Sequence, residues 1–520
     1  MIKQKMSKYS LKRIFLEPAR ILRYLFKPKP LPPLRFFEVI RFFGINFLIA
    51  TLVVVVFHWN EDLLFFKEKK DLVLDWVMYW HSDFVPIVNN EDMQRMALFE
   101  IDEEAFRQWG SPVITPRDKL KALIEKAVKG GANVIAVDLE LSWWGDGCIH
   151  APGKTSACPS LKDSRADDEL AAYLHKLNER EDANAPIIIL TRVYRYPLKK
   201  GLSDKPSFRE PSPSFLDKTL IAEKNVFWAS TFFEVDDDRV RRRWQLASLV
   251  CGTDERLGVV PSMQLLMALA QLYTNDEGTR EAAKVIRDFK KRLNQWANAL
   301  PCDARQGITI PHLCQQQNCP DLTIQLPQKK GISEENHIVN LAGGRETERV
   351  IYRFAPPDNP VSNQLSLIYK ESALDVLASG ADVENQIVFI GVTHSGSGDL
   401  HPVPIRYKEV DGVYVVANAV DTLLRFGQFQ LQPWLGKLFI SIGVIILASV
   451  IFTLYGIVMA FFMTTLLVGF ALFLWSGQAL HHGIGVDMAL PMLFIQIIQL
   501  CKYAIESFSR FVKGKTFESD

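Results

Sequence analysis

The chain has 520 residues, of which 48% are hydrophobic and 23% are charged. This composition excludes a disordered or low-complexity chain, and the length is sufficient for two or three domains. The chain has 60 Lys and Arg residues against 59 Asp and Glu residues. Because nucleic-acid-binding proteins usually carry a large basic excess, this balance argues against nucleic acid as a partner.

Charge is sorted along the chain. Residues 1–41 hold 11 Lys and Arg against 2 Asp and Glu, whereas residues 59–433 hold 44 against 53. Long apolar runs lie at the junctions between these regions. Since basic flanks of membrane helices stay in the cytoplasm, the pattern indicates a membrane protein with an acidic middle part on the outer side.

The first predicted membrane helix covers residues 39–59, where residues 42–57 contain no charge. A signal peptide is the alternative, but the preceding basic region is too long and no small-residue cleavage site follows. Residues 1–38 are predicted to form a basic amphipathic cytoplasmic tail that lies on anionic lipid, although Pro18 interrupts the helical pattern. A solvated basic tail is the simpler alternative.

Three further apolar stretches, at 435–455, 457–476 and 487–506, are predicted to be membrane helices, followed by a short cytoplasmic tail at 507–520. Four spans place both termini in the cytoplasm and residues 60–433 outside. This is the topology of a multi-pass protein of a bacterial inner membrane. His481 and His482 fall in an outer loop, where solvation is the default interpretation and a response to pH is the alternative.

Residues 60–433 alternate short apolar strands with helical patterns. Strands are predicted at 96–101, 133–139, 186–192, 225–229 and 386–392, and helices at 116–129, 166–177, 262–273, 281–299 and 413–426. Thr115 is the expected N-cap of the first helix, with Pro116 at its first position. We therefore predict an α/β domain with a mixed, partly parallel sheet, flanking helices and a β-hairpin.

The predicted hairpin pairs residues 231–235 with residues 239–250, and its turn contains Asp236, Asp237 and Asp238. Three carboxylates would suit a hard cation, but the spacing lacks the alternation and the closing Glu of a calcium loop. Because Asp tolerates turn conformations, and because the three arginines that follow at 241–243 balance its charge, a plain turn is the better interpretation.

Six cysteines lie in the outer part on this topology, which favours disulfides in an oxidising compartment. Cys148 and Cys158 bracket one loop and are the first candidate pair. Two of Cys302, Cys314 and Cys319 are also expected to join, whereas Cys251 is far from obvious partners. His312 with Cys314 and Cys319 is an alternative zinc site, but the spacing matches no common zinc motif, so we expect no metal.

Candidate binding residues lie where strands end. Asp102 and Asp138 each follow a predicted strand, and the carboxyl ends of strands in an open α/β sheet form the crevice where ligands bind. Arg117 stands at the start of the helix between them. An Asp–Arg–Asp ligand site is one interpretation, and the other is that Arg117 pairs with both carboxylates only to hold the loops.

The segment GVTHSGSGD, residues 391–399, follows another strand. Its backbone N–H groups could hold an anion, and His394, Ser395 and Asp399 are candidate ligand-binding residues. The segment is not a P-loop because no Lys follows at the required spacing. A catalytic arrangement of Ser395, His394 and Asp399 is conceivable, but the pattern of a nucleophile elbow is missing and a flexible turn is the simpler interpretation.

Five segments in order resemble the type-2 CHASE domain, an extracytoplasmic sensory module found with cyclases and histidine kinases. They are FEIDEEAFRQWGSPVITPRDKLKALIEKAVKGGANVIAVDLELS, EVDDDRVRRRW, IYRFAPP with ESALDVLASG, IVFIGVTHSGSGDLHPVPI and GVYVVANAVDTLL, and they cover most of residues 95–426. Asp102, Arg117 and Asp138 match the opening signature, while Arg239 stands where Gly is usual. One span before the domain and three after it also resemble the family architecture.

This resemblance implies a bacterial receptor that is not an enzyme and that needs no cofactor. Members commonly continue into a cytoplasmic catalytic domain, whereas this sequence stops shortly after the last predicted span, so a separate output protein is the expected partner. A homodimer or hetero-complex in membrane lipid and a small extracytoplasmic ligand are also expected. The alternative is a structural or assembly subunit of an envelope complex that docks a protein, and a periplasmic hydrolase comes third.

Overall fold

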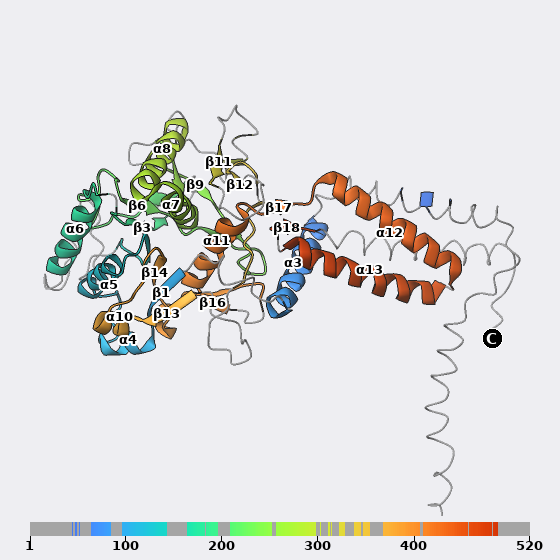
Figure 1. Cartoon of the computed structure of the whole chain (residues 1–520), viewed down its shortest axis with the longest axis horizontal. Helices are drawn as coiled ribbons and strands as arrows, with labels where there is room; N and C mark the ends of the chain where they lie inside the picture. Colours follow the sequence, from blue (N-terminus) through green and yellow to red (C-terminus); the bar gives the residue numbers. More distant parts are fainter. Residues whose placement is uncertain are drawn as a thin grey trace, which may run out of the picture. The chain divides into compact units, whose positions relative to one another are not determined.

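The computed structural model (Figure 1) describes two compact units of the chain. The residues described are 44, 47, 48, 51, 64–84, 96–142, 164–182, 184–195, 208–251, 256–297, 302, 310, 311, 314, 322–327, 337–344, 347–353, 368–405, 409–455, 457–480 and 482–486. We call Met78–Gln430 the sheet unit, and Met1–Val77 with Leu431–Asp520 the helical unit.

A single parallel sheet is the centre of the sheet unit. Its strands are β1 (Met96–Ile101), β2 (Val134–Asp138), β3 (Ile187–Thr191), β6 (Val226–Ala229), β13 (Ile368–Ser372) and β14 (Ile387–Val392). They lie in the order β13-β1-β14-β2-β3-β6, and every neighbouring pair is parallel. The five predicted strands are confirmed, whereas the edge strand β13 was not predicted. The main sheet is therefore more uniformly parallel than expected.

Two helical layers cover this sheet (Figure 1). One layer is α4 (Glu103–Gln108), α5 (Arg117–Lys129), α6 (Ser164–Asn178) and α10 (Ala373–Ser379), and the other is α7 (Met263–Glu277), α8 (Thr279–Ala297) and α11 (Gly412–Phe426). Side chains alternate between the two cores along each strand. On β1, Leu98 faces the core of α7 and α11, whereas Phe99 faces the core of α5 and α6. A sheet covered on both faces requires apolar strands, which explains why the strands could be found in the sequence.

The order of the strands creates a switch point at β14. This strand lies between β1 and β2, but the helix that follows it, α11, packs on the opposite face from α5, which connects β1 to β2. In open α/β sheets, ligands commonly bind at the carboxyl ends of neighbouring strands whose connections leave toward opposite faces. The site described below lies at this edge.

Helix α5 begins at Arg117, and Pro116 is its N-cap with no side-chain hydrogen bond. The prediction of Thr115 as the N-cap and Pro116 as the first helical residue was therefore wrong by one position. The two glycines after the helix do end it, and Gly131 has φ of 82°, a conformation that favours glycine.

The predicted hairpin is present as β7 (Phe233–Glu234) and β8 (Arg243–Trp244), which pair antiparallel. The turn confirms the prediction that the following arginines balance the charge of its aspartates, because Arg242 donates to both Asp236 (2.9 Å) and Asp238 (2.7 Å). Arg239 has φ of 67°. The backbone at Arg239 adopts the left-handed conformation that suits glycine. This conformation explains why Gly is usual at this position in the family that the sequence resembles.

The remaining elements of the sheet unit are short. They are β4 (Tyr194–Arg195), β5 (Glu210–Pro211), β9 (Ala247–Cys251), β10 (Leu257–Pro261), β11 (Thr323–Leu326), β12 (His337–Asn340), η3 (Ser395–Ser397), β15 (Leu400–Pro402) and β16 (Glu409–Asp411). The second arm of the predicted hairpin was expected to continue through residue 250, but β9 pairs with β10 instead.

Cys251 and Cys302 form a disulfide. The expectation that Cys251 lacks a nearby partner was therefore wrong, because the fold brings together residues that are 51 positions apart. Cys314 is also disulfide-bonded. Cys148, Cys158 and Cys319 lie outside the described residues, as does His312 of the alternative zinc site.

The helical unit contains α12 (Trp434–Leu454), α13 (Ile457–Leu480) and the short strand β18 (Ile484–Gly485). It also contains most of α3 (Leu64–Phe84) and the second residue of the short strand β17 (Gln430–Leu431). Helices α12 and α13 correspond to the predicted spans 435–455 and 457–476. Among the described residues, one stretch, Met459–Leu480, is long and apolar enough to cross a membrane, and Leu435–Ile451 is a shorter apolar stretch. The predicted span at 487–506, most of the span at 39–59 and both predicted tails lie outside the described residues, so four spans remain a prediction.

Candidate functional site

Ionisable side chains gather at the carboxyl edge of β1, β14 and β2. Glu100, Gly391 and Asp138 stand side by side in the register of these three strands. Glu100 and Asp138 each lie two residues after a side chain of the core under α7 and α11, Leu98 and Ala136 respectively. Because side chains two residues apart on a strand point to the same face, both carboxyl groups lie on the face covered by α7 and α11. Gly391 lets α11 approach the sheet, because a Cβ at this position would lie 2.8 Å from a methyl group of Val413.

Asp399 lies where the loop after β14 meets the first residue of α11. The N–H of Gly412 donates to the Asp399 backbone oxygen (2.9 Å), and a Cβ on Gly412 would lie 2.2 Å from Oδ2 of Asp399. The other carboxylate oxygen is 2.8 Å from Nε2 of His401. A carboxylate at a helix N-terminus is favoured by the partial positive charge of that terminus, so Asp399 stabilises the start of α11.

Glu100 connects the same helix to the edge of the sheet. Its side chain is buried, accepts a hydrogen bond from the Tyr414 hydroxyl of α11 (2.8 Å), and lies 3.0 Å from Nζ of Lys370 on β13. Burial raises the pKa of Glu100, while the bonds from Tyr414 and Lys370 lower it. The carboxylate is therefore held in place by a phenol and an ammonium group.

Two other carboxyl groups bind protons unusually tightly. Burial, with a further contribution from Asp399, raises the pKa of Asp138 to about 7, although the Thr191 hydroxyl donates to Asp138 (3.3 Å) and opposes the shift. Burial and the same Asp399 raise the pKa of Asp411 to about 6. The local excess of negative charge is thus relieved by protonation near neutral pH.

We call this group the Asp399 cluster. Its members are Glu100, Asp138, Lys370, Asp399, His401 and Asp411. Arg241 lies nearby: burial lowers its pKa, and the charges of Tyr352 and Asp399 oppose that shift. Four carboxylates and two cationic or titratable basic groups meet in the cluster. Such a cluster can bind a small ligand that carries positive charge or several hydrogen-bond donors, and it can take up a proton.

The structure separates the predicted site residues. Asp138 and Asp399 belong to the cluster. Asp102 instead caps α4, where Oδ1 accepts the Ala105 N–H (2.8 Å). Arg117 forms a buried ion pair with Asp167 of α6 (3.5 Å). The interpretation in which Arg117 pairs with Asp102 and Asp138 to hold the loops therefore gives way to a pair that joins α5 to α6.

His394 and Ser395 belong to a different contact. The Ser395 backbone N–H and its hydroxyl both donate to Oε2 of Glu103, at 3.1 Å and 2.9 Å. The His394 ring stacks on Phe106 with centroids 4.0 Å apart, and burial lowers its pKa. Because Asp399 pairs with His401 and Ser395 with Glu103, these partners differ from those of a Ser–His–Asp relay.

The sequence did not reveal Glu100, Lys370, His401 or Asp411. Two signals were available. Glu100 is a carboxylate inside an apolar strand, and Asp411 directly precedes the apolar helix α11. Lys370 and His401 gave no such signal, because only the pairing of β13 with β1 and the fold of the loop after β14 bring them to the cluster. Within the described part of the chain, no group of three or more His, Cys, Asp or Glu side chains is arranged to hold a metal ion.

The family model of the CHASE2 domain matches residues 48–457, which is more than three quarters of the chain. The chain belongs to the CHASE2 domain family. CHASE2 domains are extracytoplasmic sensory domains, and the whole sheet unit falls within the matched residues. No curated protein and no solved structure matches the chain. The Asp399 cluster is thus part of a CHASE2 sensory domain.

Proposed function

We propose that this protein is an inner-membrane receptor of a bacterium and not an enzyme. Its CHASE2 domain detects a small extracytoplasmic ligand at the Asp399 cluster and relays the signal through membrane helices to a separate partner protein. In this proposal four helices span the membrane and both termini lie in the cytoplasm. The family assignment supports the sensory role, and the route from the cluster into α12 supports the relay.

Helix α11 is the feature that carries the proposal. It begins beside Asp399 at Gly412, ends at Phe426, and is followed at Trp434 by the apolar helix α12. Seven residues, 427–433, separate the two helices. A connection of seven residues spans at most about 25 Å, so it limits how far α11 and α12 can move independently of each other.

Polar bonds fix the position of α11 along its length. Oδ1 of Asn418 accepts the Arg353 N–H (2.7 Å), and Oγ1 of Thr422 bonds both to the N–H and to the carbonyl oxygen of Ile351 (3.1 Å and 3.2 Å). Directional bonds to fixed partners favour discrete positions of a helix over continuous sliding. This property suits a two-state relay.

A ligand would act by changing which of these bonds persist. A cationic ligand that attracts the carboxylate of Asp399 competes with His401 for Oδ1 and draws Oδ2 away from the start of α11, against which it is packed. The ligand then shifts the equilibrium between two arrangements by no more than its differential affinity for them. Carboxylates that change partner in this way are the recognition element of the proposed receptor.

The decisive test is purification of the full-length protein from its own membranes in a mild detergent, followed by mass spectrometry of the bound proteins. A stoichiometric partner with a cyclase, kinase or other output domain supports the receptor. A set of structural envelope proteins alone favours an assembly subunit and contradicts it.

Ligand binding by the proposed receptor is tested on the same preparation of the full-length protein. Small cationic metabolites are screened for a saturable rise in Tm, because a ligand that binds the native state stabilises it. Asp399→Asn should abolish the rise, whereas Asp168→Asn, which changes an exposed carboxylate of α6 outside the cluster, should preserve it. An equal rise in both variants would remove the Asp399 cluster from the proposal.

A further inference from the structure

Helix α3 exposes a row of large apolar side chains. Leu72 is 58% exposed, Trp76 is 51% exposed and Trp80 is 37% exposed. Residues four positions apart lie on one face of a helix. The exposed face of α3 is therefore apolar over at least two turns.

The buried side of the same helix is apolar as well, because Val77 is only 1% exposed. A helix with apolar side chains on both its packed and its open sides is typical of a position in or against a membrane. Each Å² of apolar surface that stays in water loses about 25 cal/mol of the free energy that burial would give. The exposed Leu72 and Trp76 side chains therefore favour a non-aqueous neighbour.

The helical unit continues this apolar surface onto α13. The Trp76 ring packs on the Phe473 ring with centroids 4.9 Å apart. Along α13 the side chains of Phe462, Leu466, Phe470 and Leu474 are 53–71% exposed at a spacing of four residues. This band belongs to Met459–Leu480, the stretch that is long and apolar enough to span a membrane. Leu72 and Trp76 therefore extend a surface that already suits lipid tails.

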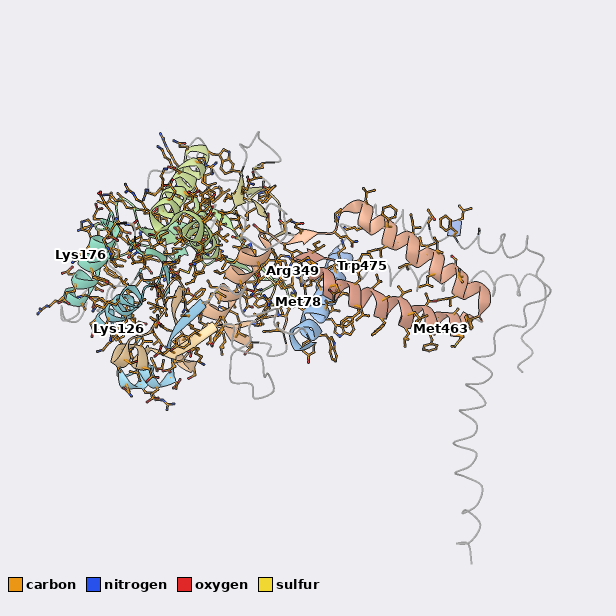
Figure 2. The ribbon with its side chains drawn as sticks, viewed as in Figure 1. Met78, Lys126, Lys176, Arg349, Met463 and Trp475 are labelled. Carbon is orange, nitrogen blue, oxygen red and sulfur yellow. A yellow bond between two sulfur atoms is a disulfide. The ribbon has the colours of Figure 1, made fainter. Side chains whose placement is uncertain are left out.

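The contact with α3 lies near one end of that span. Phe473 is within the last two turns of α13, which ends at Leu480, and the neighbouring Trp475 is 54% exposed. Figure 2 shows Trp475 and Met463 toward opposite ends of α13. Trp side chains are enriched where the hydrocarbon meets the headgroups, because the ring is apolar and its N–H can bond to water.

We propose that α3 lies in the outer interfacial layer of the membrane, with Leu72 and Trp76 against lipid and with Trp76 and Trp475 at headgroup level. The inference rests on the proposed membrane topology, in which α13 ends on the outer side and α3 follows the first span after a few residues. The chain between the predicted end of that span, residue 59, and Leu64 can reach at most about 17 Å. The start of α3 therefore stays close to the membrane surface.

Lipid fits this face better than a second copy of the chain. The apolar row is continuous with the lipid-type band of α13 through the contact of Trp76 with Phe473. A bilayer interface also accepts a Trp row beside the charged residues Lys70, Asp71 and Asp75 of the same helix, which are only partly exposed. A protein partner would need a complementary surface, whereas lipid needs none.

Photocrosslinking of the full-length protein tests the proposal. A benzophenone amino acid is placed at position 72 of α3, and the protein is reconstituted in vesicles of phosphatidylethanolamine and phosphatidylglycerol. Position 466 in the exposed band of α13 is the membrane control, and position 221 in the sheet unit, where Ile221 is 84% exposed, is the aqueous control. Since the probe reacts only with groups in contact, we expect about tenfold more lipid adduct at 72 than at 221.

The outcomes separate this inference from the proposed function. Lipid adducts at 72 and 466 but not at 221 support it. Lipid adducts at 466 with chain-to-chain crosslinks at 72 mean that a second copy covers α3. Lipid adducts at 466 with no adduct at 72 mean that α3 lies away from the membrane. Both results overturn the interfacial position of α3 and leave the proposed receptor function intact. No lipid adduct at 466 overturns the membrane topology itself.

Discussion

Asp399 and Gly412 are packed so closely that residue 412 has no room for a side chain. A Cβ on Gly412 would lie 2.2 Å from Oδ2 and 2.9 Å from Oδ1 of Asp399. The carboxylate therefore lies directly against the first residue of α11. In the receptor proposed above, a ligand that moves the Asp399 carboxylate would displace the start of α11 through this contact.

Gly412→Ala should displace either the Asp399 carboxylate or the start of α11. The methyl group would enter a space filled by a carboxylate, and overpacking of this kind costs about 1–3 kcal/mol. We expect a lower Tm of the full-length protein in detergent and a loss of any ligand-dependent rise. Gly443→Ala in α12 is the matched control, because a Cβ at this position would meet no atom of the described residues within 4 Å. Equal Tm values for the two variants would contradict the contact.

The stability of the protein should fall as pH rises toward neutrality because of Asp138. Its pKa is about 7 in the fold against an ordinary 3.8, so between about pH 4 and 7 the folded state binds the proton more tightly than the unfolded state. The stability contributed by this group is present below that window and is lost as pH rises through it, on the order of 2–4 kcal/mol. Asp411 adds a smaller contribution of the same sign, with a pKa of about 6.

Asp138→Asn checks this dependence through the Tm between pH 5 and pH 8. The variant should show a flatter profile than the unmodified protein, since an amide stays neutral at every pH. Asp168→Asn, on the exposed face of α6, should retain the slope of the unmodified protein. A slope that survives Asp138→Asn unchanged would assign the dependence to another group.

Arg117→Met should destabilise the fold by about 3–5 kcal/mol, because it leaves the Asp167 carboxylate buried without its cation. Adding Asp167→Leu should recover most of the loss, since an apolar pair can replace a buried ion pair. Denaturant unfolding measures both effects, and Arg107→Met at an exposed position is the control. If the double variant were folded and stable but no longer bound a ligand that the unmodified protein binds, Arg117 would be a ligand residue after all.

Replacing Cys251 and Cys302 together by Ala should lower the free energy of unfolding by about 4 kcal/mol, the chain-entropy value for a loop of 51 residues. The paired substitution is preferable to a reducing agent, because Cys314 is also disulfide-bonded. Thermal unfolding under oxidising conditions provides the measurement. An unchanged Tm would show that the loop is restrained by other contacts.

The strands and helices of the sheet unit could be predicted because burial on both faces produces long apolar runs with clear ends. The predicted strand at 96–101 matches β1 residue for residue, and the predicted helix at 413–426 differs from α11 by one position. The disulfide between Cys251 and Cys302 could not be predicted, because sequence spacing does not report that α8 returns the chain to β9. Helix α3 was missed because its apolar residues are mixed with charges near its start.

The sequence by itself determined the alternation of strands and helices, the apolar membrane-type segments and the resemblance to a sensory family, since each is written in local composition and order. Only the tertiary structure decided which ionisable groups meet. Asp138 and Asp399 could be identified from the sequence because each ends a predicted strand or loop. Glu100, Lys370 and His401 join them only through the parallel register of β13, β1 and β14 and through the fold of one loop. Electrostatic interactions depend on distance in space and on burial, and neither is encoded in the spacing of residues along the chain.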